Sequence, residues 1–300
     1  MHGIRPFLIG AVLWVVGCSG GAGSHDAGAP DDSGSTGDGP NGVVDAGGPA
    51  PSNDRCASAI PISLVTMHSN ISATTIGASA DLAAPCGAAG TPDVFFKFTL
   101  TRRELVYADT FGATSSTALF FASSCTTART GATTPNDAVC STGACGTGQS
   151  QVTALLDPGT HYLVLAGQGA ATIHFQHAEV GTGTVAYLAR GSSAPTGTTS
   201  GFGGLYSCEA GGSENAYWWQ TCPGDAGGTF VGSTCTGTDF DTILSLQLPG
   251  SETTMCDDDS CSVQSAVSAN IPVGAGLYVL AVDGFSQAKH GNYTLTASRP

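Results

Sequence analysis

The same series of short apolar segments occurs twice in this chain, and this duplication is the strongest constraint on its fold. Each segment runs apolar or alternates in polarity between Gly, Pro, Asp or Ser residues, as β-strands do. Short strands repeated in this way predict an all-β chain of two tandem jelly-roll-like antiparallel β-sandwiches. Three matched pairs carry the repeat: Asp93–Thr99 with Asn215–Thr221, Ser116–Phe120 with Asp241–Ser245, and Leu156–Ala166 with Ile271–Ala281.

The composition favours the same fold class. Glycine accounts for 43 of 300 residues and charged residues for 11%, and no long segment combines helix-forming residues with a 3.6-residue period. We expect the first sandwich to span residues 53–180 and the second 181–300, with the boundary near Gly181 to Ala186.

The N-terminus has the features of a bacterial lipoprotein signal over residues 1–17. Arg5 is followed by the apolar run Phe7–Val16, which is too short to span a bilayer as a helix. Val15–Cys18 reads Val-Val-Gly-Cys, a lipobox that predicts cleavage before Cys18 and acylation of its thiol. The alternative is an ordinary cleaved secretory signal. Because Ser19 is not the aspartate associated with inner-membrane retention, we expect sorting to the outer membrane.

Residues 18–52 predict a disordered tether, because they are rich in Gly, Ser, Ala, Pro and Asp and contain no aromatic residue. The formal charge of −14 is typical of a protein that remains soluble outside the cell. Arg102-Arg103 is the only adjacent basic pair, which argues against nucleic-acid binding. Membrane attachment would rest on the lipid at Cys18.

Apart from Cys18, the chain contains ten cysteines, an even number that indicates disulfides in an exported protein. One alternative pairs Cys125 with Cys140 and leaves Cys145 for Cys208. Zinc is disfavoured because no Cys-x2-Cys spacing occurs. The pairs favoured by short separations or a turn, with the last joining the two halves, are Cys56–Cys86, Cys140–Cys145, Cys222–Cys235, Cys256–Cys261 and Cys125–Cys208.

Several motifs, taken in order, resemble the bacterial pre-peptidase C-terminal domain, a jelly-roll-like sandwich found on secreted proteases and alone in surface lipoproteins. The first half departs from this pattern, because Ser115-Ser116 replaces Phe-Asp. The motifs are Asn53–Ile60, Phe240–Leu244, Cys256–Asp259, Ser265, Gly274–Gly284 and Gly291–Leu295.

The acidic loop Asp257-Asp258-Asp259 is the candidate calcium site. Asp239, Asp241 and Asp283 lie at the ends of predicted strands and could complete the six to eight oxygen ligands that calcium takes. The resemblance also implies calcium, since some members of that family bind it. The alternative is a solvated acidic turn.

Tyr217-Trp218-Trp219 is the densest aromatic cluster. On a strand, Tyr217 and Trp219 face one side and Trp218 the other. Matching Trp219 with Lys97 of the first half predicts that Trp219 is exposed, where Trp219 and Tyr217 could contact a sugar or a partner protein. The alternative is that both indoles fill a core or the seam between the halves.

Catalysis is not indicated. His161, His174 and His177 lie in the last strands of the first half without a metal-ligand spacing, and no Gly-x-Ser-x-Gly elbow occurs. A Ser-His-Asp cluster could form only from residues distant in sequence. The sequence therefore predicts a non-enzymatic cell-surface lipoprotein that binds polysaccharide or protein partners, with no cofactor other than calcium. The alternatives are a structural envelope spacer and an extracellular hydrolase.

Overall fold

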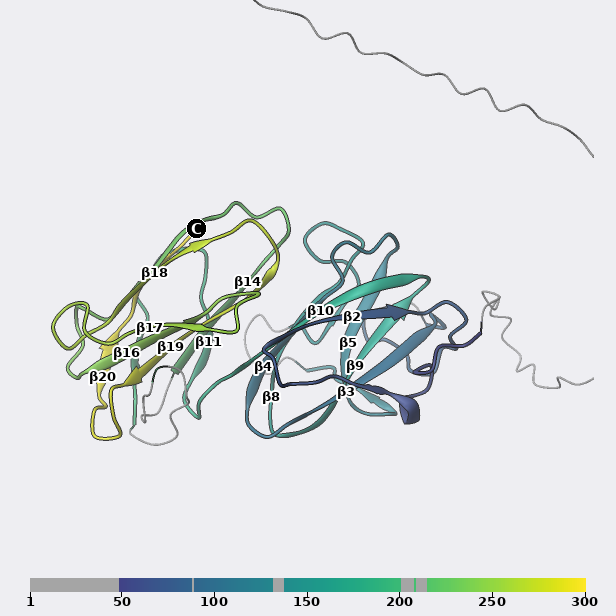
Figure 1. Cartoon of the computed structure of the whole chain (residues 1–300), viewed down its shortest axis with the longest axis horizontal. Coiled ribbons are helices and arrows are strands. Elements are labelled where there is room, and N and C mark those ends of the chain that lie inside the picture. Colours follow the sequence, from purple (N-terminus) through teal and green to yellow (C-terminus); the bar gives the residue numbers. More distant parts are fainter. Residues whose placement is uncertain (1–48, 88, 132–137, 201–207, 209–214) are drawn as a thin grey trace, which may run out of the picture. The chain divides into compact units, whose positions relative to one another are not determined.

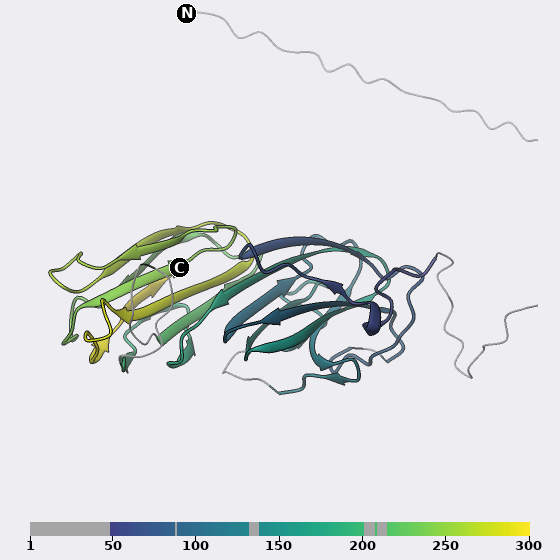
Figure 2. The same cartoon turned by 60° about the horizontal axis from the view of Figure 1, so that its bottom comes forward.

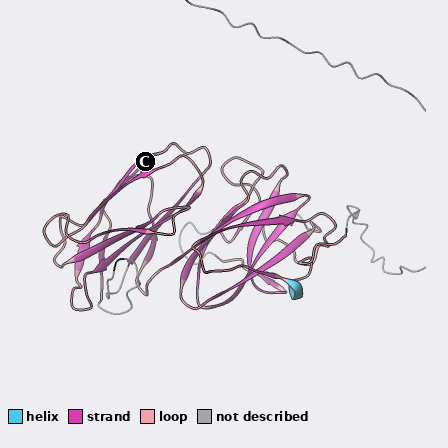
Figure 3. Cartoon of the chain, viewed as in Figure 1, coloured by secondary structure: helices cyan, strands magenta, loops and turns pink. Residues whose placement is uncertain are grey.

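A computed structural model describes residues 49–87, 89–131, 138–200, 208 and 215–300. These residues are all-β apart from the 3-10 turn Cys56–Ser58 and a 3-10 conformation at Cys208, which confirms the predicted fold class (Figure 3). The predicted signal peptide, Cys18 and most of the tether lie outside the described residues.

The strands from Ile60 to Glu179 form the first sandwich (Figure 1). Its first sheet has the order β1 (Ile60–Pro61), β3 (Asp93–Leu100), β9 (Gly159–Gly167), β5 (Thr117–Ser124) and β6 (Thr127–Ala128), with β7 (Cys140–Ser141) also pairing with β5. Its second sheet has the order β2 (His68–Thr74), β10 (Ala170–Glu179), β4 (Glu104–Asp109) and β8 (Gln151–Leu156).

The strands from Val185 to Arg299 form the second sandwich, and the two groups of strands stay distinct when the view is turned (Figure 2). Its first sheet has the order β11 (Val185–Tyr187), β14 (Asn215–Thr221), β19 (Gly276–Gly284), β16 (Thr242–Gln247) and β17 (Thr254–Asp257). Its second sheet has the order β12 (Gly191–Ser193), β21 (Thr296–Arg299), β15 (Gly228–Ser233) and β18 (Ala266–Ile271), and β13 (Thr196–Thr198) pairs with β20 (Asn292–Thr294).

The strand orders of the two sandwiches correspond position by position, as the sequence repeat predicts. Strand pairing is antiparallel except for the edge pairs β1/β3 and β11/β14, which are parallel in both copies. A buried hydroxyl cluster is duplicated as well. Thr110 and Thr117 lie 2.6 Å apart beside Ser150 in the first sandwich. Thr234 and Thr242 lie 2.7 Å apart beside Ser265 in the second.

An apolar seam joins the second sheet of the first sandwich to the first sheet of the second. Leu105 and Leu155 pack in one buried cluster with Trp218, Leu277 and Val279. Polar contacts border this cluster, because the Gln176 side chain exchanges two hydrogen bonds with the backbone of Leu277 and Thr153 donates to Gln220 over 2.6 Å. Burial of these apolar side chains favours a fixed arrangement of the two sandwiches.

All ten predicted disulfide cysteines are paired, but the five predicted pairs are wrong. The actual bonds join cysteines that are 26 to 77 residues apart, because strand ends that meet in a sandwich come from distant parts of the chain. One bond does join the two sandwiches, as expected, but it uses Cys145 and Cys222. The pairs are Cys56–Cys125, Cys86–Cys140, Cys145–Cys222, Cys208–Cys256 and Cys235–Cys261.

Candidate functional site

The predicted aromatic contact site is buried. Trp219 is 0% exposed and stacks on Tyr278 with ring centroids 4.9 Å apart, while Tyr217 is 6% exposed and bonds Tyr293. The predicted exposure of Trp219 was wrong by one position in strand register. Leu163 and Tyr278 occupy matching positions in the two copies of the repeat. Phe96 pairs with Leu163 and Trp219 pairs with Tyr278, so the counterpart of Trp219 is the core residue Phe96 and not Lys97. A shift of one residue moves every side chain of a strand to the other face.

The predicted calcium ligands do not converge. Among the described residues, no group of three His, Cys, Asp or Glu side chains is arranged to hold a metal ion. Asp257 instead accepts hydrogen bonds from Ser260 and from the amide of Ala266, and Asp258 and Asp259 are exposed. These carboxylates do not fit the six- to eight-oxygen shell of calcium.

The other three aspartates have separate environments. Asp239 accepts a 2.9 Å hydrogen bond from the amide of Asn292, and Asp241 lies 3.7 Å from the Lys289 ammonium group. Asp283 is buried, and its Oδ2 atom has no hydrogen-bond partner in the described part of the chain. Desolvation by burial raises the pKa of Asp283 to about 6, although the amide of Gly284 donates to its carboxylate.

Two of the three histidines are committed to structural contacts. His161 bonds the carbonyl of Asp157 over 2.8 Å, and burial lowers its pKa. His177 Nδ1 lies 2.6 Å from Glu104, and its Nε2 atom lies 3.1 Å from the carbonyl of Thr66. Burial opposes the charged form of His177 most strongly, but the hydrogen bond and charge of Glu104, together with the Thr66 carbonyl and the charge of Glu179, outweigh burial and raise the pKa.

The third histidine belongs to a set of polar side chains on the outer face of the second sheet of the first sandwich. Residues that are opposite one another in adjacent strands share a face. The strand register therefore places Asn70, His174, Asp109 and Gln151 in one row across β2, β10, β4 and β8. We call this the groove row. The next row on that face, the anchor row, consists of His68, Gln176, Tyr107 and Thr153.

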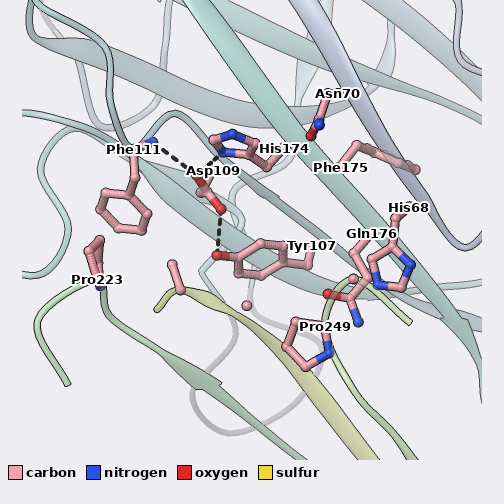
Figure 4. Close-up of a pocket in the computed structure, with 13 residues that line it drawn as sticks. His68, Asn70, Tyr107, Asp109, Phe111, His174, Phe175, Gln176, Pro223 and Pro249 are labelled. Carbon is pink, nitrogen blue, oxygen red and sulfur yellow. Dashed lines mark hydrogen bonds and ion pairs between the residues drawn. The ribbon is translucent and has the colours of Figure 1, made fainter. Parts of the chain in front are cut away.

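Asp109 organises the groove row (Figure 4). Its Oδ1 atom accepts hydrogen bonds from His174 Nδ1 over 2.8 Å and from the amide of Phe111 over 2.9 Å, and its Oδ2 atom accepts from the Tyr107 hydroxyl over 2.7 Å. The hydrogen bond to Asp109 raises the pKa of His174. Burial raises the pKa of Tyr107 well above its usual value, so this hydroxyl stays protonated and donates.

The network continues into the second sandwich. The Gln151 amide donates to the Tyr107 hydroxyl over 3.0 Å and to the carbonyl of Thr221 over 2.9 Å. Thr221 is followed by Cys222, whose bond to Cys145 joins the sandwiches. The orientation of Asp109 therefore depends on contacts of both sandwiches.

Six residues of these two rows, all except Gln151 and Thr153, line a groove of about 510 Å³, a volume within the usual range of small-molecule sites. The second sandwich supplies the opposite wall, where Gly276 allows close packing because a Cβ atom there would collide with Pro249. We use the name groove for the cavity lined by His68, Asn70, Tyr107, Asp109, Phe111, His174, Phe175, Gln176, Pro223, Pro249, Gly250, Ala275 and Gly276.

The groove offers hydrogen-bonding groups but no evident nucleophile. Its lining contains no Ser, Thr, Cys or Lys among the described residues, and the Tyr107 hydroxyl is engaged with Asp109. The side-chain amide of Asn70 and the Nε2 atom of His174 have no hydrogen-bond partner in the described part of the chain. This arrangement can hold a polar ligand, whereas a Ser-His-Asp triad is not assembled at His174.

Of the residues that line the groove, His174 was a candidate from the sequence, whereas Asn70, Tyr107, Asp109 and Phe111 were not. A signal was present, because Tyr107 and Asp109 alternate with apolar residues along one strand, as His174 and Gln176 do along another. Polar residues at every second position of a buried strand indicate a polar face. What the sequence could not provide is the pairing of His174 with Asp109, 65 residues apart.

No helix in the described ranges is long and apolar enough to cross a membrane. No known protein family and no curated protein matches the chain. Among solved structures, it is similar to a protein from Eubacterium rectale that is inferred to be secreted. That similarity has 9% identity and a TM-score of 0.21 and covers 69% of this chain and 68% of the other, which is too distant to assign a function.

Proposed function

We propose that this chain is a non-enzymatic, lipid-anchored protein of the bacterial outer membrane that binds extracellular polysaccharide in the groove. The observation that supports this function best is the groove row, in which Asn70 and His174 present polar atoms with no hydrogen-bond partner among the described residues, beside a buried carboxylate that fixes the imidazole. Binding sites typically combine a mostly apolar cavity with a few fixed polar groups of this kind.

Location outside the cytoplasm is supported by chemistry that is independent of the groove. Five disulfides are typical of proteins that fold in oxidising compartments. The lipobox ending at Cys18 supports anchoring, and the resemblance to pre-peptidase C-terminal domains of surface lipoproteins is consistent with it.

The test is retention of the full chain, kept soluble in mild detergent, on immobilised matrix polysaccharide prepared from the producing bacterium. The Asn70→Ala/His174→Ala variant should lose most of the retention. The matched control is Asn270→Ala/His290→Ala, which removes the same two residue types at exposed positions outside the groove and should retain wild-type binding. Equal retention of the groove variant and wild type would contradict the proposal.

A structural spacer is the second candidate, favoured by the seam and by the Cys145–Cys222 bond that joins the sandwiches. A spacer predicts no retention of any variant on the polysaccharide. A hydrolase would instead shorten the polysaccharide and release new reducing ends, which a reducing-sugar assay on the same column detects.

A further inference from the structure

We infer that the groove selects a neutral, hydroxyl-bearing sugar unit, with Nε2 of His174 and the amide of Asn70 as its hydrogen-bonding pair, and that it disfavours acidic sugars. This inference rests on the proposed function and names the ligand class of the same site. It derives from the register of the sheet, the direction of the hydrogen bonds and the charge of the groove.

The two groups lie next to each other by strand pairing. His174 of β10 is directly opposite Asn70 of β2 in the antiparallel ladder. Side chains at such positions project from the same face with Cβ atoms about 4.5–5.5 Å apart. Figure 4 shows both side chains along the same side of the groove. Two adjacent polar groups at this spacing suit neighbouring hydroxyls of one sugar ring.

The direction of the hydrogen bonds favours a hydroxyl ligand. A carboxylate only accepts, so His174 donates its Nδ1 hydrogen to Asp109, and the neutral imidazole then presents a lone pair at Nε2. The amide of Asn70 both donates and accepts. A sugar hydroxyl also does both, so it can donate to Nε2 while it accepts from Asn70. A carboxylate or sulfate oxygen cannot donate to Nε2.

The charge of the groove opposes acidic ligands. Its lining contains no Lys or Arg among the described residues, and burying an anion without a cationic partner is costly. The titratable groups that face His174 are Asp109 and Tyr107 from β4 and His68 from β2, and His68 is itself 3.1 Å from Glu252. When His174 is protonated, the adjacent carboxylate of Asp109 balances its charge.

The apolar parts of the lining suit the carbon face of a sugar ring. Phe111 and Pro223 lie together at one side of the groove, and Pro249 lies at the other (Figure 4). Aromatic and proline surfaces pack against C–H groups, while the groove row bonds the hydroxyls.

The experiment is calorimetric titration of the full chain at pH 8 with two series of oligosaccharides. One consists of neutral hexose oligomers, and the other consists of uronic-acid oligomers of equal length and linkage. At least one neutral oligomer should bind ten times or more tightly than its acidic counterpart. Asn70→Ala and His174→Gln, tested singly, should each weaken binding of this neutral oligomer about tenfold. The control variant Asn270→Ala/His290→Ala should bind it as wild type does. Melting temperatures confirm that each variant is folded.

Tighter binding of the acidic series, or no binding of either series, would overturn the inference. The results that would contradict the proposed function differ from those that would contradict this inference. If the chain is retained on matrix polysaccharide through Asn70 and His174 but prefers acidic oligomers, only the ligand class is wrong. If neutral oligomers bind but matrix retention does not depend on these residues, the groove selects sugars and the proposed role at the cell surface is wrong.

Discussion

His174 Nδ1 lies 2.8 Å from Oδ1 of Asp109, a buried carboxylate that also accepts from the Tyr107 hydroxyl and from the amide of Phe111. This single contact fixes the imidazole ring and determines which of its nitrogens faces the groove. In the proposed function, Asp109 is therefore a residue that positions His174 for ligand binding.

Replacing Asp109 by Asn should lower the pKa of His174 towards or below 6.5, because the hydrogen bond to the carboxylate is the main cause of its raised value. The substitution preserves the shape of the side chain, but the charge that favours imidazolium is lost. An NMR titration of the imidazole signals measures the change, with His161 as an internal control. An unchanged pKa of His174 would show that Asp109 does not set its protonation.

The pair formed by His177 and Glu104 should make stability depend on pH. The pKa of His177 is raised in the folded state, so its contribution is complete below about pH 6.5, the usual unfolded value, and is lost as pH rises through the folded pKa. Urea unfolding between pH 5.5 and 8.5 should therefore show a decline that is smaller in His177→Gln, where only the raised pKa values of His174 and Asp283 still contribute to it. If the variant declines as steeply as wild type, the pair is not the cause.

Asp283→Asn should stabilise the protein at pH 8. The pKa of Asp283 rises from 3.8 to about 6 on folding, so the folded state loses stability as pH rises through this interval. The shift corresponds to up to about 3 kcal/mol at 1.36 kcal/mol per pKa unit. Asn keeps an acceptor for the amide of Gly284 and removes the buried charge.

Chemical unfolding of the Asp283→Asn variant and wild type at pH 8 and pH 3.5 measures this effect, which should disappear at the lower pH. The same pair of proteins tests the predicted calcium site. If calcium bound Asp283, wild type would gain stability in millimolar calcium and the variant would not. A lower stability of Asp283→Asn at pH 8 would contradict the assignment of Asp283 as a destabilising buried carboxylate.

The bond between Cys145 and Cys222 should contribute to the groove as well as to stability. Its removal in Cys145→Ser/Cys222→Ser should cost about 4.5 kcal/mol by loop entropy, given a separation of 77 residues. Cys86→Ser/Cys140→Ser, with a separation of 54, should cost a similar amount within the first sandwich. Only the first variant should weaken polysaccharide retention, because Pro223 adjoins Cys222 and lines the groove. Equal weakening by both variants would point to general destabilisation.

The fold was predictable because the repeat and the alternation of apolar residues follow directly from strand geometry. The faces of the strands were harder to predict. Trp219 was matched with Lys97 instead of Phe96, and this one-residue error reversed its burial. The disulfides failed for a related reason, because nearness in sequence does not determine which strand ends meet. Tertiary pairing brings Asp109 to His174 and keeps the predicted calcium ligands apart.

The most direct test of the central claim is hydrogen–deuterium exchange of the full chain with and without saturating matrix polysaccharide. The account predicts slower exchange in peptides that contain Asn70, Phe111 and Pro223, which line the groove from both sandwiches, and no change in the acidic loop 257–259. Slower exchange confined to that loop or to the sheets away from the groove, or no change anywhere, would contradict the assignment of the groove as the binding site.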